Sequence, residues 1–216
     1  MALKVIITGA TGMVGEGVLL ECVQNDNISE ILLVGRKSYG QSLPKTRELI
    51  VKDFWEIGHH TDTLQGYDAC FYCAGVSAMG KNEADYTYIT YDTTLYFAKT
   101  LATLNSNMVF TFVTGWGTDS TEKGKSMWAR VKGKTENDLM QLPFKGQYNF
   151  RPAGMKPVKG QKNVRWFFKP LISIFSLIAP SGMLSLHEVG KAMINAVLKG
   201  YPKQVLEVKD IRQLGA

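Results

Sequence analysis

Three glycines near the start of the chain have the spacing of a phosphate-binding turn. Residues 8–15 read TGATGMVG, in which Gly9, Gly12 and Gly15 stand three apart and follow a short apolar run. Such a turn between a strand and a helix lets a pyrophosphate approach the backbone, where the amides of the helix N-terminus bind the anion. The spacing is one residue wider at its start than the commoner G-x-G-x-x-G fingerprint, and the alternative is that the glycines only pack a tight strand-to-helix turn. The dinucleotide interpretation places the following residues around the cofactor: Thr8, Gly9, Thr11, Gly12, Met13, Val14 and Gly15.

The end of the next predicted strand bears on which dinucleotide binds. About twenty residues beyond the turn, where an acidic residue would hold the ribose hydroxyls of NAD, the chain instead has Arg36 and Lys37. An arginine there can pair with a 2′-phosphate through its planar guanidinium, and Lys37 adds positive charge. The pattern favours NADP over NAD as the cofactor. The alternative is a solvated Arg–Lys pair on the surface.

Two other clusters of reactive side chains have a plainer interpretation. Cys70 and Cys73 have the spacing of a redox motif, but they lie in a strand-like run, where such side chains point to opposite faces. We interpret the cysteines as buried thiols. His59, His60 and Asp62 suggest a metal cluster, but adjacent histidines in an extended loop point apart and no third ligand stands at a supporting interval. We therefore expect no metal site.

The elements that would position these residues are short β-branched runs alternating with helix-length amphipathic segments. This alternation is typical of an α/β fold with a parallel sheet. The runs predicted to be strands are 4–8, 30–34, 48–52, 69–73, 108–114, 148–150 and 204–208. The segments predicted to be helices are 12–24, 83–104, 121–142 and 186–199.

Length and composition favour a single domain, residues 1–216. The chain has 216 residues, of which 45% are hydrophobic, and this suits one globular domain with a sizeable core. The net charge of +6 is spread along the chain without the dense basic stripe typical of nucleic-acid binding, so small anionic molecules are the better candidate partners. We recognise neither a signal peptide nor an apolar run long enough to span a bilayer, and we predict a cytoplasmic location.

Motifs along nearly the whole chain can be compared with a known family. Besides the glycine turn, they are VKDF at 51–54, CAG at 73–75, YD at 91–92, FVTG at 112–115, FRP at 150–152 and VGKAM at 189–193. Together they resemble the short-chain dehydrogenases/reductases, specifically the extended and atypical branch with T-G-x-x-G-x-x-G. The last motif looks like the late helix of small atypical members, the Tat-interacting oxidoreductase-like proteins among them. The resemblance implies a doubly wound parallel-sheet Rossmann fold that binds NAD(P), with a small C-terminal substrate lobe or flap at 153–185.

The resemblance also implies roles for individual residues. Asp53 stands where the family's Asp contacts adenine, and residues 73–75 match the small residues that line the cofactor. Thr114 stands where the family has a catalytic Ser or Thr, and Arg151 belongs to the Arg-Pro pair of the extended branch. The implied cofactor contacts beyond the glycine turn are Arg36, Lys37, Asp53, Phe54, Cys73, Ala74, Gly75, Lys132 and Arg151.

The chain departs from the family at its catalytic helix. These dehydrogenases use Tyr-x-x-x-Lys, in which the lysine lowers the pKa of the phenol and the tyrosine moves the substrate proton. This chain has Trp128 and Lys132 at those positions. The indole donates a hydrogen bond but does not ionise, so Trp128 cannot be a general base, although it can bond a carbonyl or stack on the nicotinamide. Lys132 would still reach the nicotinamide ribose, and the Thr114 hydroxyl could orient a substrate oxygen.

Tyrosines on the preceding helix could replace the missing phenol. The candidates are Tyr86, Tyr88 and Tyr91, for which core or interface packing is the alternative use. His187 opens a late helix, and we interpret it as a residue of the helix cap or the pocket rim.

Residues 164–180 form an aromatic and apolar segment where extended members of the family build their substrate lobe. Pro170 and Pro180 bracket a helix of about two or three turns, too short to span a membrane. The competing uses are core packing, a flap over an apolar pocket, and a membrane or subunit contact. We expect the segment to wall a largely apolar substrate site and to be mobile without ligand.

Two hypotheses about function remain open. The first is an NADPH-dependent reductase of a small, largely apolar carbonyl-type substrate, with the proton coming from water, Lys132 or a displaced tyrosine. The catalytic candidates are Thr114, Trp128 and Lys132. The second is a non-catalytic NADP-binding sensor or regulator, which the tryptophan at position 128 favours. A homodimer is compatible with both hypotheses.

Overall fold

The computed structural model describes residues 2–164 and 182–216. In these ranges the strands are β1 Leu3–Thr8, β2 Ile28–Gly35, β3 Thr46–Ile50, β4 Ala69–Tyr72, β5 Val109–Val113, β6 Gly146–Arg151, β7 Gly154–Lys156, β8 Met183–Ser185 and β9 Val205–Glu207. The α-helices are α1 Met13–Gln24, α2 Thr61–Leu64, α3 Glu83–Thr87, α4 Thr93–Leu104, α5 Met127–Leu139, α7 Leu186–Lys199 and α8 Val208–Leu214. A 3₁₀-helix, η1, spans Phe54–His60, and a π-helical turn, η2, spans Tyr88–Asp92.

Seven of the described strands form one parallel sheet in the order β3-β2-β1-β4-β5-β6-β9. The chain runs outward from β1 to β2 and β3, and then returns to β4 on the other side of β1. Where the strand order reverses in this way, the carboxyl ends of the two central strands leave a crevice for a ligand. The doubly wound parallel-sheet Rossmann fold predicted from the sequence is confirmed.

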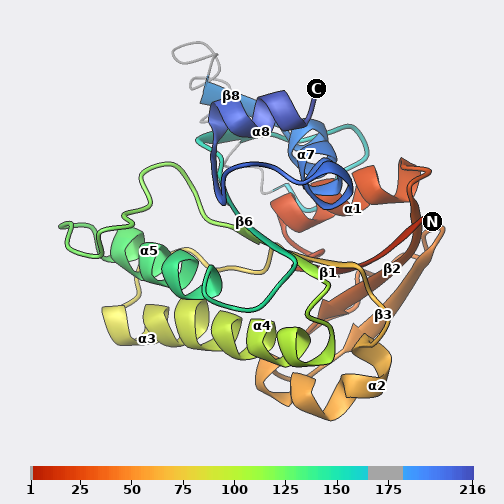
Figure 1. The fold of residues 1–216 in the computed structure, drawn as a ribbon, viewed down its shortest axis with the longest axis horizontal. Helices are drawn as coiled ribbons and strands as arrows, with labels where there is room; N and C mark the ends of the chain where they lie inside the picture. Colours follow the sequence, from red (N-terminus) through yellow and green to blue (C-terminus); the bar gives the residue numbers. More distant parts are fainter. Residues whose placement is uncertain (1, 165–181) are drawn as a thin grey trace.

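Helices cover both faces of the sheet, as Figure 1 shows with α1, α7 and α8 on one side and α3, α4 and α5 on the other. Successive side chains of a strand point to opposite faces, so each central strand supplies both cores. Val5 and Ile7 of β1 belong to the core under α1 and α7, whereas Ile6 belongs to the core under α4. Both cores are apolar and fully buried, which makes the sheet edge a rigid base for the loops above it.

Several element boundaries differ from those expected. The third strand is Thr46–Ile50 rather than 48–52, and the predicted helix at 121–142 begins only at Met127. The delay has a local cause, because the Asp119 carboxylate accepts hydrogen bonds from the backbone amides of Thr121 and Gly124 and holds the segment as a loop. The predicted helix at 83–104 exists, but the π-helical turn η2 interrupts it.

Near the C-terminus, the predicted helix at 186–199 is confirmed, and β9 lies inside the predicted strand at 204–208. The small parallel pair β7–β8 and helix α8 were not predicted. Each of these strands has only three residues, which is too short for a pattern of alternation. The proposed pocket wall at 164–180 falls almost entirely on 165–181, outside the described residues.

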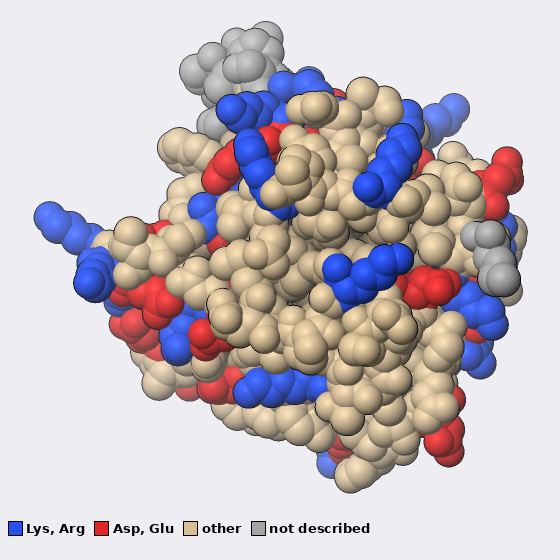
Figure 2. Space-filling model, viewed as in Figure 1, with Lys and Arg blue, Asp and Glu red and all other residues tan. Residues whose placement is uncertain are grey.

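On the face shown in Figure 2, basic and acidic side chains are interspersed and do not gather into one basic band. Within the described ranges, no helix combines the length and the apolar character needed to cross a membrane.

Candidate functional site

The glycine turn is built so that its backbone segments touch. Gly9 has φ +72°, a left-handed conformation that favours glycine, and a Cβ on it would stand 2.7 Å from the backbone nitrogen of Ala74. A Cβ on Gly15 would stand 2.2 Å from the Gly9 carbonyl oxygen, and the Gly12 amide donates to that same oxygen at 2.9 Å. Side chains at Gly9 and Gly15 are therefore excluded, and the first turn of α1 lies directly against the loop after β1.

Thr8 connects the turn to the neighbouring strand. Its buried Oγ1 accepts hydrogen bonds from the backbone amides of Cys73 and Ala74, both at 3.1 Å. These two hydrogen bonds fix the ends of β1 and β4 relative to each other at the switch point of the sheet. The structure thus brings together the glycine turn and the residue 73–75 loop, in which Gly75 is exposed.

The basic residues after β2 lie at the same edge of the sheet. Arg36 and Lys37 are both exposed. Burial raises the pKa of the Tyr72 hydroxyl at the end of β4, and the Arg36 guanidinium partly opposes this shift. Arg36 directly follows β2 and Tyr72 ends β4, the two strands on either side of β1.

Asp53 and Phe54 have structural partners. The Asp53 carboxylate caps η1 by accepting a hydrogen bond from the Trp55 amide at 3.1 Å. The Phe54 ring packs on Tyr72 and Phe97, with ring centroids 6.2 and 5.2 Å apart. Asp53 is nevertheless exposed, so its side chain borders solvent at the carboxyl end of β3.

Lys132 is the central charged residue of a cavity at this edge of the sheet. The cavity has a volume of about 350 Å³ and is lined by Val76, Ser77, Ala78, Met79, Tyr86, Trp128 and Lys132. The Lys132 Nζ donates to the carbonyl oxygen of Thr114 at 2.8 Å. Burial lowers the pKa of Lys132 to about 8, although Glu136 acts in the opposite direction. A lysine with such a pKa can donate a proton near neutral pH.

Trp128 shares this cavity, as the four-residue spacing on a helix requires. The far end of its indole ring lies beside Gly117, because a Cβ on Gly117 would be 3.7 Å from Trp128 Cη2. Gly117 has φ +84° and belongs to the loop after β5. The indole therefore extends from α5 towards that loop, beside Lys132.

Thr114 meets Lys132 through its backbone rather than its side chain. Its Oγ1 donates to the Glu136 carboxylate at 2.5 Å and also lies 3.2 Å from the carbonyl oxygen of Phe150. The hydroxyl is buried. The sequence suggested that this hydroxyl orients a substrate oxygen, but here it is bonded within the protein and the carbonyl holds the lysine.

Arg151 forms a buried ion pair with Glu136, the carboxylate that also accepts a hydrogen bond from Thr114. Its Nε donates to both Glu136 oxygens at 3.1 Å, and its Nη2 is also bonded to that carboxylate. Nη2 donates to Ser120 Oγ at 2.5 Å, and Nη1 bonds Glu207 at 3.3 Å. Every nitrogen of the guanidinium thus has a protein partner, which gives Arg151 a bracing role between β6, α5 and β9 where the sequence suggested a cofactor contact.

The three candidate tyrosines have different surroundings in the structure. Tyr86 is buried and lines the cavity that contains Lys132, and burial raises the pKa of its hydroxyl. Tyr88 is half exposed and stacks on Trp55, with ring centroids 5.7 Å apart. The Tyr91 hydroxyl donates to the Asp138 carboxylate at 2.6 Å. Only Tyr86 of the three shares the cavity with Lys132.

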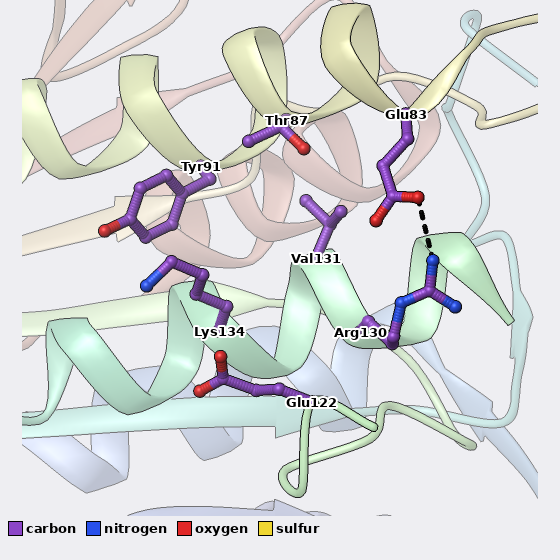
Figure 3. A pocket seen from close by; sticks show the side chains of 7 residues that line it. All are labelled: Glu83, Thr87, Tyr91, Glu122, Arg130, Val131 and Lys134. Carbon is purple, nitrogen blue, oxygen red and sulfur yellow. Dashed lines mark hydrogen bonds and ion pairs between the residues drawn. The ribbon is translucent and has the colours of Figure 1, made fainter. Parts of the chain in front are cut away.

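Tyr91 lies in a separate, smaller pocket of about 140 Å³ between α3, η2 and α5. Figure 3 shows this pocket, with an ion pair between Glu83 and Arg130 at one end and Tyr91 beside Lys134 at the other. The Glu83 carboxylate and the Arg130 guanidinium are 2.8 Å apart. These contacts join the two helices that carry Tyr86 and Lys132.

The remaining candidate side chains do not line the cavity that contains Lys132. Cys22 and Cys70 are buried free thiols, as interpreted, whereas Cys73 is a half-buried free thiol, and burial raises the pKa of all three. His187 lies in the first turn of α7, where its Nδ1 meets the Glu21 carboxylate. Within residues 2–164 and 182–216, no three His, Cys, Asp or Glu side chains form a group that could hold a metal ion.

The parallel sheet, its switch point and the glycine turn beside it define a dinucleotide-binding protein of the Rossmann class. Residues 5–121, more than half of the chain, match the NAD dependent epimerase/dehydratase family. The chain belongs to this family, which binds an NAD(P) nucleotide. The resemblance to the extended and atypical short-chain dehydrogenases/reductases is thereby confirmed.

Individual relatives are more distant. The protein HTATIP2 from Rattus norvegicus is 25% identical over 152 residues, which are 69% of this chain and 62% of that protein. The match therefore spans less than two thirds of the relative's length.

Solved structures support the fold. The glucuronic acid dehydrogenase of Chromohalobacter salexigens has a TM-score of 0.70 at 16% identity, over 96% of this chain and 76% of its own. The ligand-free aldohexose dehydrogenase of Thermoplasma acidophilum also scores 0.70, at 14% identity over 97% and 94% of the two chains. The Bordetella bronchiseptica enzyme WbmF, solved with NAD⁺, scores 0.69 at 15% identity over 99% and 76%.

Proposed function

We propose that the protein is an NADP(H)-dependent reductase of a small, largely apolar carbonyl compound. The observation that carries the proposal is the position of Lys132, a lysine with a pKa of about 8 in a cavity at the carboxyl edge of a dinucleotide-binding sheet. Perturbed lysines in such clefts are common among catalytic acids and bases. The cofactor, when bound, supplies the hydride.

The glycine turn and the basic residues after β2 fit the pyrophosphate and the 2′-phosphate of NADP. The contact between Gly9 and Gly15 brings bare backbone to the start of α1, where a pyrophosphate can approach the helix amides. Arg36 and Lys37 supply positive charge at the end of β2, where no carboxylate opposes a 2′-phosphate. Lys132 would hold the nicotinamide ribose. These features support NADP rather than NAD.

Two residues of the cavity can serve the substrate oxygen. The Lys132 ammonium can donate a proton to an alkoxide and recover it from water, because its pKa of about 8 keeps it charged at neutral pH yet acidic enough to transfer. Burial raises the pKa of Tyr86, so its phenol stays protonated and can donate a hydrogen bond. Val76, Ala78 and Met79 line the same cavity with apolar side chains, which favours an apolar substrate.

A non-catalytic NADP-binding sensor is the second candidate. It is favoured by the indole of Trp128 in place of an ionisable phenol and by the bond that directs the Thr114 hydroxyl to Glu136. A cytoplasmic location, a homodimer and the absence of nucleic-acid binding complete the proposal. Sedimentation and the distribution of a tagged protein between cell fractions would test these points.

The cofactor preference is tested by fluorescence titration with NADPH and NADH. We expect NADPH to bind more tightly, and we expect Arg36→Ala to weaken NADPH by about 1.5 to 3 kcal/mol, the range for a charge-assisted hydrogen bond. NADH affinity should stay nearly constant. Equal affinities of the unmodified protein for the two cofactors would refute the NADP assignment.

The chemistry is tested by the pH dependence of NADPH oxidation with a panel of apolar aldehydes and ketones. Lys132 donates the proton only when it is charged, so the reduction rate should be constant below pH 8 and fall as the pH rises through about 8. Lys132→Met should remove this limb together with most of the activity. If NADPH binds but no carbonyl is reduced, the sensor hypothesis is favoured instead.

A further inference from the structure

A buried carboxylate stands in the first turn of α1. Glu16 is fully buried, and its oxygens accept hydrogen bonds from the Tyr39 hydroxyl at 3.1 Å, the Lys162 amide at 3.0 Å and the Asn163 amide at 2.7 Å. An ionised carboxylate costs much free energy to bury unless such donors surround it. These donors come from two loops, one after β2 and one after β7, so Glu16 joins three segments of the chain.

Tyr39 belongs to the loop after β2 that begins with Arg36 and Lys37. Both ends of the residue are fixed, because its hydroxyl is bonded to Glu16 and its backbone amide donates to Glu48 Oε1 on β3 at 2.7 Å. Burial, and the neighbouring Glu16, raise the pKa of Tyr39 to about 12, so the phenol remains a donor at any physiological pH. The loop is therefore pinned against α1 only three residues after Arg36.

The second loop, residues 157–164, reaches the same turn of α1. Gln161 donates from Nε2 to the carbonyl oxygen of Met13 at 2.7 Å, and its Oε1 accepts from the Val158 amide at 2.7 Å. The Lys162 and Asn163 amides of this loop donate to the Glu16 carboxylate, and the Lys162 amide and the Tyr39 hydroxyl share one oxygen, Oε1. The loop and Tyr39 therefore meet at the same carboxylate.

We propose that Glu16 and Tyr39 are positioning residues for cofactor selectivity, because they hold the Arg36–Lys37 end of β2 where these cations meet a ribose 2′-phosphate. This inference rests on the proposed preference for NADPH. Neither residue touches the phosphate. Their effect is to order the loop before binding, which reduces the entropy lost when the guanidinium engages its ligand.

The test uses Tyr39→Phe, which removes one hydroxyl and keeps the ring. The measurement is the ratio of NADPH to NADH affinity by fluorescence titration, together with the melting temperature. We expect the NADPH dissociation constant to rise by about 2- to 10-fold, the effect of one lost hydrogen bond, while that of NADH changes by less than about twofold. A general loss of stability would not alter this ratio.

Tyr67→Phe is the matched control. Its phenol makes the same kind of bond, to Glu30 at 2.7 Å, and burial raises its pKa to about 12 as well, but it lies just before β4, at the amino edge of the sheet. We expect it to lower the melting temperature without changing the affinity ratio. Glu48→Ala is a second test variant, since it releases the Tyr39 amide from an exposed position on β3.

The outcomes separate the inference from the proposed function. If the unmodified protein binds both cofactors equally, the NADP assignment fails. If it prefers NADPH and both Tyr39→Phe and Glu48→Ala keep its affinity ratio, the positioning role is refuted while the assignment stands. A parallel loss of affinity for both cofactors would also refute it, because Tyr39 would then support the glycine turn as a whole. Should Tyr39→Phe not fold, Glu48→Ala alone decides.

Discussion

At the scale of single residues, the cavity around Lys132 contains the side chains proposed to act on the substrate, but position 128 supplies no ionisable phenol. Lys132 and Trp128 stand one helical turn apart, and the hydroxyl of Thr114, which was expected to orient a substrate oxygen, is bonded to Glu136. An indole can hold a substrate oxygen but cannot pass it a proton. A tyrosine at position 128 would place a phenol where the indole now stands, one helical turn from Lys132.

This leads to a prediction for Trp128→Tyr. We expect the substitution to create or raise NADPH-dependent carbonyl reduction, because Lys132 lies four residues away on the same helix and would lower the pKa of the new phenol. The rate of NADPH oxidation with generic aldehydes measures it. The unmodified protein should be slow or inactive on these compounds.

If the unmodified protein instead turns over at ordinary enzyme rates, of order 1 to 1000 per second, its proton donor is Lys132 or a tyrosine rather than a phenol at position 128. The comparison of Lys132→Met, Tyr86→Phe and Tyr91→Phe then identifies the donor. Tyr86 shares the cavity with Lys132, whereas the Tyr91 hydroxyl is bonded to Asp138 in the other pocket. Loss of activity in the Tyr91 variant alone would contradict the role assigned to Tyr86.

At the scale of elements, the buried ion pair between Arg151 and Glu136 holds β6 against α5. Removing one member of a buried ion pair leaves the other charge uncompensated. We expect Arg151→Met to lower the free energy of unfolding by about 3 to 5 kcal/mol, as measured by urea denaturation. Because Glu136 also fixes Thr114, cofactor-dependent activity should fall further than stability alone explains.

The control for this prediction is Arg130→Met. Arg130 pairs with Glu83, whose side chain is 54% exposed, and such surface pairs contribute about 0 to 1 kcal/mol. A similar loss of stability in the two variants would show that Arg151 is no more important than a surface arginine.

The sequence predicted the main elements because their patterns are long and strong. The glycine turn, the central strands and the late helix at 186–199 all lie where the spacing placed them. Short elements were not predicted, because a three-residue strand such as β7 is too short to show an alternation of apolar and polar residues. The predicted start of α5 was wrong because the Asp119 carboxylate binds the backbone amides of residues that would have extended the helix.

The site was only partly predictable, because spacing along the chain says nothing about which atom of a residue faces its neighbour. The spacing of Trp128 and Lys132 predicts that they lie close together, and both line one cavity, but the carbonyl of Thr114, rather than its hydroxyl, meets the lysine. Glu136 gave no signal in sequence, since a carboxylate on a helix is ordinarily solvated. Its burial becomes evident only when β6 brings Arg151 next to it.

At the scale of the whole molecule, ligand binding should stabilise the entire sheet. The cofactor would touch loops from β1, β2 and β4, which meet at one edge, so unfolding releases it completely. We expect NADPH at about 100 times its dissociation constant to add about 2.7 kcal/mol of stability, a rise in melting temperature of about 5 to 10 °C.

Differential scanning fluorimetry measures this shift, with NADH at the same concentration as the control. A smaller shift with NADH is expected. Because the effect needs binding only, it should appear whether the protein is a reductase or a sensor. The absence of any shift with either nucleotide would contradict both functions.

The π-helical turn η2 has a geometric consequence for the helix that contains it. In this turn the Thr93 amide bonds the Tyr88 carbonyl five residues earlier, which amounts to one residue more than an α-helix would use. One residue corresponds to about 100° of rotation about the helix axis. The side chains of α4 are therefore rotated about the helix axis relative to those of α3. After the turn, Leu95 and Phe97 pack into the core, whereas Tyr86, before the turn, lines the cavity that contains Lys132. The rotation therefore lets the two parts of the helix contact different neighbours.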